Sequence, residues 1–203
     1  MAKEILGILC SGRGSNLQSI IDNIENGNIN AEIKIVLTDK PNAMALTRAE
    51  EARIKALCVD RKKFETREAF EEELLKELKQ AGVTLVILAG FMRLLSPLFV
   101  RAYEGRIMNI HPALLPAFQG AHAHRDVLAY GVKVSGCTVH FVDEGMDSGP
   151  IILQEAVPVK DNDTEETLAA RVLKVEHKLY PEAIRLFTEG KLKIEGRKVK
   201  IVN

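Results

Sequence analysis

The first half of the chain alternates short apolar runs with longer segments of helical period, and this alternation limits the fold more than any other feature. The apolar runs have strand length and cover residues 5–9, 32–37, 56–59, 83–89 and 107–110. Between them, segments 15–25 and 66–79 repeat apolar residues at helical spacing. This pattern is typical of βαβ units. We therefore expect an open, twisted, mostly parallel α/β sheet with helices on both faces.

The second half of the chain departs from that alternation. Segment 109–124 has little regular period and contains two prolines and three histidines. An irregular stretch of this length inside a compact domain is usually functional. Segments 136–142 and 151–159 are predicted strands, joined by the turn-rich segment 143–150.

A long helical pattern and an alternating tail complete the chain. The helical pattern covers 164–189, and we expect Pro181 to break or bend it because proline lacks the backbone N–H. Segment 191–203 alternates apolar and polar residues around Glu195-Gly196, which predicts a C-terminal β-hairpin. Because no linker, repeat or low-complexity stretch interrupts the sequence, we expect a single domain over residues 1–203.

Composition and charge exclude several classes of partner. The 28 basic and 28 acidic residues cancel, so the chain has no overall field that would gather nucleic acid or an anionic membrane. No apolar run approaches the length of a membrane-spanning helix, and the first run is too short for a signal peptide. We therefore expect a cytoplasmic protein without nucleic-acid or membrane partners, which binds any anionic substrate locally.

The three cysteines, Cys10, Cys58 and Cys137, are widely spaced and include no Cys-x-x-Cys pair. They predict free thiols rather than a disulfide framework or a zinc cluster. Cys10 stands beside a glycine-rich turn and could be a nucleophile. A small buried residue at the end of a strand is the more ordinary interpretation.

That glycine-rich turn, residues 11–16, follows the first predicted strand and opens the first predicted helix. A helix N-terminus offers free N–H groups and partial positive charge to a phosphate. Gly14 permits close backbone approach, and Ser15 and Asn16 can cap the helix or donate to phosphate oxygens. The turn lacks both the dinucleotide fingerprint and the P-loop lysine. The turn therefore predicts a phosphate-binding site, but not one for NAD or ATP. A simple tight turn between strand and helix explains the glycines equally well.

Asn109 and His111 stand two residues apart at the end of a predicted strand, so both side chains point to the same side. An amide and an imidazole could donate to the oxygen of an attacked carbonyl group, and His111 could also pass a proton. His122 and His124 lie nearby, but their spacing without further ligands predicts no metal site. A lone histidine at a strand end is more often structural, so the catalytic interpretation depends on its partners.

Segment 143–150 offers three acidic partners for His111. A carboxylate beside the imidazole would favour its protonated form and could relay a proton. Asp147 is one candidate, and Asp143 and Glu144 are its rivals. Acidic residues in such turns are often only solvated turn formers, and the residues by themselves do not choose among the three.

Several segments together resemble the folate-dependent formyltransferases, and the resemblance covers nearly the whole chain. They occur in the family's order at residues 11–16, 88–95, 109–116 and 136–142 followed by 147–151. The resemblance implies the family's Rossmann-like formyltransferase fold. It also implies a phosphate-binding half, 1–106, and a catalytic and folate-binding half, 107–203.

The resemblance further implies an activity. Asn109, His111 and Asp147 match the family's catalytic residues. The donor would be the co-substrate 10-formyltetrahydrofolate, with no metal, and the acceptor would be the amine of glycinamide ribonucleotide in purine biosynthesis. The amine would attack the formyl carbon directly while Asn109 and His111 stabilise the oxyanion and Asp147 assists proton transfer. We expect a monomer or a homodimer.

Binding residues follow from the same resemblance. Gly14, Ser15 and Asn16 would hold the substrate phosphate, and Glu176 would contact its ribose. The implied folate-binding residues are Arg67, Met92, Arg93, Leu94, Leu95, Asn109, His140, Val142 and Asp147. Gln119 and Leu173 depart from the pattern of many relatives, in the loop after His111 and in the late helix.

Other activities are compatible with parts of this pattern. A formyl-folate hydrolase or a methionyl-tRNA formyltransferase would resemble the chain around the catalytic motif. We expect neither, because the chain shows no added domain of the kind each usually carries, and the neutral charge also disfavours tRNA. From another class, a non-catalytic phosphate-ligand binding module could keep the fold. The intact set of Asn109, His111 and Asp147 argues against that alternative.

Overall fold

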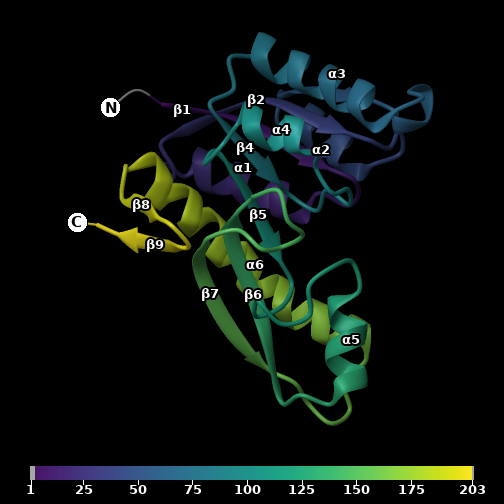
Figure 1. The fold of residues 1–203 in the computed structure, drawn as a ribbon, viewed down its shortest axis with the longest axis vertical. Helices are drawn as coiled ribbons and strands as arrows, with labels where there is room; N and C mark the ends of the chain where they lie inside the picture. Colours follow the sequence, from purple (N-terminus) through teal and green to yellow (C-terminus); the bar gives the residue numbers. More distant parts are fainter. Residues whose placement is uncertain (1–2, 203) are drawn as a thin grey trace. The chain divides into compact units, whose positions relative to one another are not determined.

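Four parallel strands form the centre of the first of two compact units in this computed structural model, which describes residues 3–202 (Figure 1). The strands of this unit, which ends at Met108, are β1 (Glu4–Cys10), β2 (Ala31–Thr38), β3 (Lys55–Cys58) and β4 (Leu85–Leu88). β1 pairs in parallel with β2 and β4, and β2 pairs in parallel with β3. Their order is therefore β3-β2-β1-β4.

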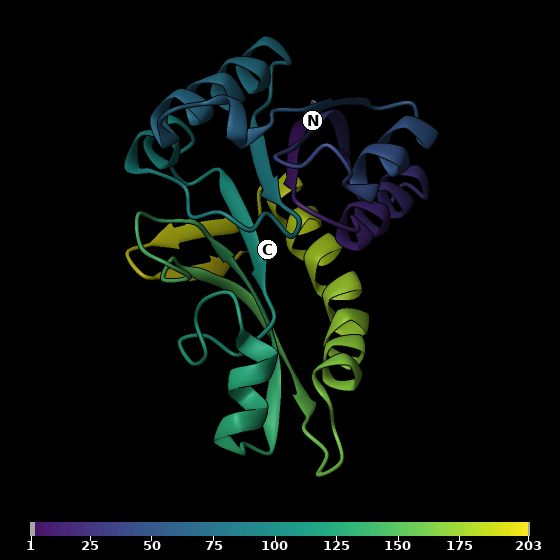
Figure 2. The same ribbon diagram turned by 90° about the vertical axis from the view of Figure 1, so that its right-hand side faces the viewer.

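Helices cover both faces of these strands. They are α1 (Ser15–Glu25), α2 (Met44–Glu51), α3 (Arg67–Gln80) and α4 (Pro97–Ala102), with a short 3-10 turn, η1 (Arg61–Lys63). Figure 2 shows α1 and α2 on one side of the strands and α3 and α4 on the other. The apolar stripes of α1 and α3 are buried, and each such side chain contributes about 1.5–3 kcal/mol. Because the four strands are parallel, their carboxyl ends all lie at one edge of the sheet.

The second unit begins at Asn109, inside β5 (Ile107–His111), and continues with mixed strand pairing. β6 (Val134–Phe141) pairs antiparallel with β7 (Ile151–Pro158). β7 pairs in parallel with β9 (Lys198–Ile201), which forms an antiparallel hairpin with β8 (Leu192–Glu195). The strand order in this unit is β5-β6-β7-β9-β8. Its helices are α5 (Ala123–Tyr130) and α6 (Glu165–Thr188), and α6 packs against β6 and β7.

The expected class is confirmed, because the first unit is a parallel sheet with helices on both faces and the second unit has mixed strand pairing with helices. Every predicted strand forms, as do the helices predicted over 15–25 and 66–79 and the C-terminal hairpin. Within residues 3–202, no helix is long and apolar enough to cross a membrane.

Helix prediction was less complete than strand prediction. The expected break at Pro181 does not occur, since α6 continues through that residue. Tyr180 and Ile184 on either side of it are fully buried, and their packing offsets the backbone hydrogen bond that proline removes. α2, α4 and α5 were not predicted. α5 begins at Ala123, inside the stretch 109–124 that was expected to be irregular.

The start of α6 provides a test of its local stability. Thr164 Oγ1 accepts a hydrogen bond from the Thr167 N–H at 3.3 Å, and Thr167 Oγ1 accepts one from the Thr164 N–H at 2.9 Å. Thr164→Ala removes one of these two bonds and should lower the free energy of unfolding by about 1 kcal/mol. Thr164→Ser keeps the hydroxyl and should stay close to the wild type. Urea denaturation measures both, and equal losses would contradict the capping role.

Candidate active site

The end of β5 supplies two of the predicted site residues. Asn109 and His111 alternate with Met108 and Ile110, so they share one face of the strand. His111 is only 4% exposed. A polar ring enclosed to this degree needs hydrogen-bond partners, and two other segments of the second unit provide them.

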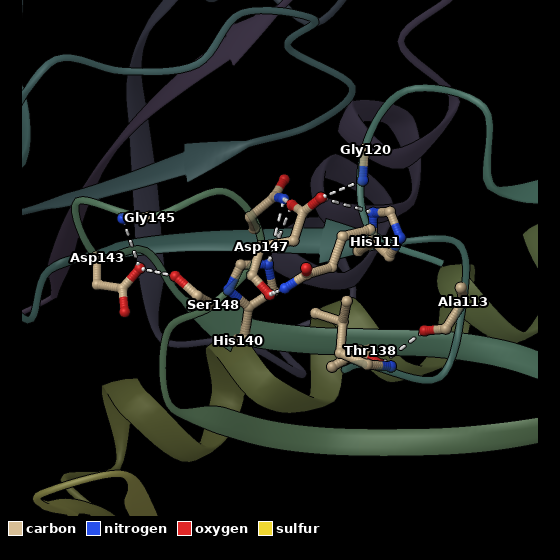
Figure 3. Close-up of polar contacts among 12 residues, drawn as sticks. His111, Ala113, Gly120, Thr138, His140, Asp143, Gly145, Asp147 and Ser148 are labelled. Atoms are coloured by element: carbon tan, nitrogen blue, oxygen red, sulfur yellow. Dashed lines mark hydrogen bonds and ion pairs between the residues drawn. The ribbon is translucent and has the colours of Figure 1, made fainter. Parts of the chain in front are cut away.

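Asp147 is the acidic partner of His111. Its Oδ2 lies 3.4 Å from His111 Nδ1, and its Oδ1 lies 3.5 Å from Asn109 Nδ2. Figure 3 shows Asp147 directed toward His111 and His140. The structure thus brings together the three residues that the family resemblance had singled out, and of the carboxylates open from the sequence it places Asp147 beside His111.

Asp143 has a different role. Its Oδ1 accepts hydrogen bonds from the Gly145 N–H at 3.1 Å and from the Ser148 hydroxyl at 2.6 Å. These bonds close the turn that carries Asp147 (Figure 3). Asp143 is therefore a turn former, as its Gly-rich context suggests.

The loop after His111 holds Asp147 from a second side. The Gly120 N–H donates to Asp147 Oδ2 at 2.9 Å, and Gln119 Nε2 donates to the Asp147 carbonyl oxygen at 3.2 Å. Gln119, one of the two departures from the family pattern, thus contacts the backbone of a site residue. Asp147 itself has a φ of 49°, in the left-handed region, where a non-glycine residue is strained. Several contacts together hold the residue in this conformation.

His111 faces a hydrogen-bond acceptor on each side of its ring. Its Nε2 lies 2.7 Å from the carbonyl oxygen of Phe118, and its Nδ1 faces the Asp147 carboxylate. A carbonyl oxygen only accepts, so Nε2 carries a proton. The ring is therefore held between two acceptors that come from different segments of the second unit.

His140, on β6, lies on the other side of Asn109. Its Nε2 is 3.3 Å from Asn109 Nδ2, and its Nδ1 is 2.8 Å from the carbonyl oxygen of Phe141. Burial lowers the pKa of His140 below its ordinary value, although the Phe141 carbonyl and the Asp147 carboxylate act in the opposite direction. The family resemblance gave His140 a folate contact, and that role stays a prediction.

Thr138 and Gln154 support the loop and were missed by sequence reasoning. Thr138 Oγ1 donates to the Ala113 carbonyl oxygen at 2.7 Å and accepts from the Leu115 N–H at 3.0 Å. Gln154 Nε2 donates to the Leu115 carbonyl oxygen at 2.8 Å. These bonds fix the start of the loop that later presents the Phe118 carbonyl to His111. Strand alternation could have put Thr138 and His140 on one face of β6, but it does not reveal what that face contacts.

The C-terminal hairpin also contacts the loop that carries Asp147. Arg197, in the turn between β8 and β9, donates from Nη2 to the Ser148 carbonyl oxygen at 2.8 Å. Ser148, the residue after Asp147, is thereby hydrogen-bonded to a segment distant in the sequence.

In the first unit, the glycine-rich turn has the geometry of a backbone cradle. Gly14 is the residue before α1 and has a φ of 69°. A Cβ placed on it would lie 2.9 Å from Cα of Ala45, at the start of α2, so no side chain fits there. A hollow of about 260 Å³ adjoins the turn and includes basic Arg13 and Lys40 in its lining. Backbone N–H groups beside basic side chains suit an anion.

The residues implied as folate-binding in the first unit follow the end of β4. Met92 is 70% exposed and Leu94 is 53% exposed, whereas Leu95 is buried. Arg93 Nε lies 2.6 Å from Asp39 Oδ2. At the start of α3, Arg67 Nε lies 3.0 Å from Oε1 of the buried Glu71. Both arginines are thus held by carboxylates while part of each side chain stays exposed.

Glu176 and Val142 belong to the second unit. Glu176 is 7% exposed in α6, and its charge adds to the burial that raises the pKa of Cys137. It is therefore a buried carboxylate near β6 rather than a surface residue. Val142 directly follows β6 and is half-buried. Across residues 3–202, no three His, Cys, Asp or Glu side chains gather as a possible metal ligand set.

Comparison with known proteins gives consistent results. The family described as "Formyl transferase" matches residues 5–184. The chain is 44% identical to a phosphoribosylglycinamide formyltransferase of Escherichia coli, over 92% of this chain and 88% of that protein. A crystal structure of glycinamide ribonucleotide transformylase 1 from Symbiobacterium toebii is 50% identical with a TM-score of 0.98, covering 100% of this chain and 95% of that one.

A longer relative matches over a small part of its length. The chain is 46% identical to a trifunctional purine biosynthetic protein adenosine-3 of Drosophila melanogaster, over 93% of this chain. The chain spans only 14% of the length of that relative. The match therefore concerns one portion of the longer protein.

The cysteines allow a direct test of the nucleophile interpretation. Cys10 is buried at the end of β1, and burial raises its pKa to about 12, as it does for Cys137. At about pH 8 both thiols are protonated and enclosed, so only the exposed Cys58 should react quickly with a thiol reagent in the folded protein. Cys58→Ser should abolish the fast phase. Fast labelling of Cys10 would instead support a nucleophilic role.

Proposed function

This chain belongs to the formyl transferase family, and we propose that it transfers the formyl group of 10-formyltetrahydrofolate to the amine of glycinamide ribonucleotide. The products are formyl-glycinamide ribonucleotide and tetrahydrofolate, in purine biosynthesis. The observation that carries the proposal is the cluster of Asn109, His111 and Asp147, in which two donors converge on one carboxylate. The names of the relatives support the choice of acceptor. Residues 1–203 act as a single formyltransferase domain.

The cluster would assist the reaction by stabilising the negative charge that develops on the formyl oxygen. The amine nitrogen attacks the formyl carbon, whose oxygen becomes an oxyanion. His111 Nδ1 and Asn109 Nδ2 face the Asp147 carboxylate at 3.4 and 3.5 Å, which are long contacts for hydrogen bonds. Donors held toward one negative group at such distances can turn to a second one nearby with little loss. Because only this small movement is needed, they stabilise the oxyanion with little reorganisation, and this is where electrostatic catalysis gains most.

Proton movement completes the reaction. The attacking nitrogen loses a proton as its bond to carbon forms, and the folate nitrogen gains one as its bond to the formyl carbon breaks. Asp147 accepts the first proton, directly or through water, because its carboxylate stands beside the donors that bind the oxyanion. The Gly120 N–H and the His111 ring keep this carboxylate in position.

Binding roles are assigned to both parts of the acceptor. The cradle of Gly14, Ser15 and Asn16 holds the phosphate, supported by the left-handed backbone of Gly14 and the adjoining basic hollow. Glu176 contacts the ribose through its carboxylate.

Folate binding is assigned to residues of two kinds. The exposed apolar side chains of Met92 and Leu94 offer a surface to an aromatic ring system, and the two partly exposed arginines suit carboxylates. The complete proposed set is Arg67, Met92, Arg93, Leu94, Leu95, Asn109, His140, Val142 and Asp147.

The decisive experiment follows formyl transfer from 10-formyltetrahydrofolate with and without glycinamide ribonucleotide. Deformylation that depends on the amine and yields its formyl product supports the proposal. Equal deformylation without the amine would indicate a hydrolase. Absence of any reaction, with binding of the phosphorylated amine retained, would indicate a binding module.

Two neighbouring carboxylates provide a matched test of the proton acceptor. Asp147→Asn should lower kcat by about 10²–10⁴-fold with a small change in KM, because it removes the charge that receives the proton. Asn tolerates the left-handed backbone, so the loop should keep its shape. Asp143→Asn alters a turn former of the same loop and should cost much less. Similar losses in both variants would mean that only loop structure matters.

A second matched pair tests the phosphate cradle. Gly14 and Gly82 both have a φ of +69°, but only at Gly14 would a Cβ meet another segment. Gly14→Ala should raise KM for glycinamide ribonucleotide by about tenfold, equivalent to about 1.4 kcal/mol of binding. Gly82→Ala carries the same backbone strain far from the cradle and should leave KM unchanged. Steady-state kinetics decides, and an unaffected KM in Gly14→Ala would refute the cradle.

A further inference from the structure

His140 is a buried histidine without a part in the proposed chemistry. Its side chain stands on β6 and is 2% exposed. Both ring nitrogens have protein partners, since Nδ1 lies 2.8 Å from the Phe141 carbonyl oxygen and Nε2 lies 3.3 Å from Asn109 Nδ2. The ring is therefore fixed at both ends, and one end contacts the amide proposed to bind the oxyanion.

The Phe141 carbonyl decides which nitrogen of His140 carries the proton. A carbonyl oxygen only accepts, so the 2.8 Å contact requires a proton on Nδ1. In a neutral ring Nε2 is then an acceptor. An amide nitrogen only donates, so the contact at 3.3 Å is a hydrogen bond from Asn109 to His140. If Nε2 carried a proton instead, that proton would point toward the hydrogens of the Asn109 amide, and no hydrogen bond could form between them.

The groups that face His140 are compatible with a neutral ring. Asp147 Oδ1 is 3.8 Å from Nε2, and the charge of Asp143 also acts on the ring, both favouring protonation. Burial and the neighbouring His111 act against it, and burial is the largest effect, so the pKa of His140 lies below its ordinary value. The two histidines beside Asn109 thus have opposite patterns. His111 lies between two acceptors, whereas His140 Nε2 lies nearer to the Asn109 amide nitrogen, at 3.3 Å, than to the Asp147 carboxylate, at 3.8 Å.

We propose that His140 is a positioning residue that fixes the orientation of the Asn109 amide, so that its second N–H is presented to the formyl oxygen. This rests on the function proposed above. Without an acceptor at Nε2, the amide can rotate by half a turn and present its own oxygen to the oxyanion. Asn109 Nδ2 lies 3.3 Å from His140 Nε2 and 3.5 Å from Asp147 Oδ1, so the contact with Asp147 is the longer of the two. When the substrate binds, Asn109 gives up this longer contact with Asp147 and donates to the formyl oxygen instead.

Two variants of His140 separate an acceptor from mere bulk. His140→Gln can place an amide oxygen near the position of Nε2, whereas His140→Leu fills similar space without an acceptor. His140→Leu should lower kcat by about ten- to a hundredfold, because removal of one oxyanion donor costs about a hundredfold or more. Gln should recover most of that loss. A change in KM for the folate would report the separate folate contact proposed above. Equal kcat in both variants would overturn the proposal.

Combining these changes with Asn109→Ala shows whether His140 acts through Asn109. In the Asn109→Ala background, His140→Leu should have almost no further effect on kcat. A full additional loss would mean that His140 acts independently and would overturn the proposal. If Asn109→Ala by itself leaves kcat unchanged, the oxyanion role in the proposed function fails. If only His140→Leu is without effect, the positioning role fails and the function stands.

A measurement on the unaltered protein decides the case even where a variant does not fold. Nitrogen NMR of ¹⁵N-labelled histidine reports which ring nitrogen is protonated. We expect His140 to show a protonated Nδ1 and a bare Nε2 at neutral pH, with Asn109→Ala shifting the Nε2 resonance. A protonated Nε2 would overturn the proposal, because that nitrogen could not accept the amide N–H.

Discussion

The carboxylate of Asp147 is the group on which the polar cluster of the second unit depends. It receives the His111 ring from β5, the Gly120 N–H from the following loop and the Asn109 amide. A carboxylate that is largely enclosed is costly without donors, so these groups stabilise Asp147 as much as Asp147 orients them. The dependence is mutual: loss of any one partner changes the surroundings of the others. Substitution of one member of the cluster should therefore rearrange the remaining side chains.

The side chains of the cluster differ in what their surroundings require of them. His111 lies between two acceptors, whereas His140 lies close to an amide donor, and burial lowers its pKa below the ordinary value. The distinction arises from backbone carbonyls, those of Phe118 and Phe141, which each engage one ring nitrogen. Backbone atoms thereby set the protonation pattern of the side chains. Neighbouring titratable groups with opposed environments are a common means of giving two residues separate tasks.

The sequence predicted the framework well and the site in part. Apolar periodicity located every strand because burial in a sheet imposes a repeat of two or a continuous apolar run. The same alternation correctly paired Asn109 with His111 on one face of β5. Asp147 could not be distinguished from Asp143 by residue type, since the difference lies in the loop: Asp143 closes the turn and Asp147 projects from it. Only the family resemblance made that choice in advance.

Other features depend on contacts between segments distant in the sequence. α2 has only two turns and a mixed composition, so its role at the glycine-rich turn was not apparent. Thr138 and Gln154 are ordinary strand residues until β6 and β7 are paired and the loop is placed beside them. The acceptor role of His140 likewise requires knowing that β5 is its neighbour. Apolar periodicity predicts which face of a strand a residue occupies, but it does not predict which residue of another segment lies against that face.

The left-handed backbone of Asp147 restricts which residues natural variation can use at that position. Glycine and asparagine adopt this conformation most easily, but neither carries a charge. Glutamate carries the charge, but its longer side chain cannot keep the same contacts with Gly120 and His111, and it adopts this backbone less readily. Backbone geometry and acid–base chemistry thus exclude different sets of amino acids, and aspartate alone satisfies both. Substitutions at this position would therefore remove the proton-transfer role proposed for Asp147 more readily than they would unfold the protein.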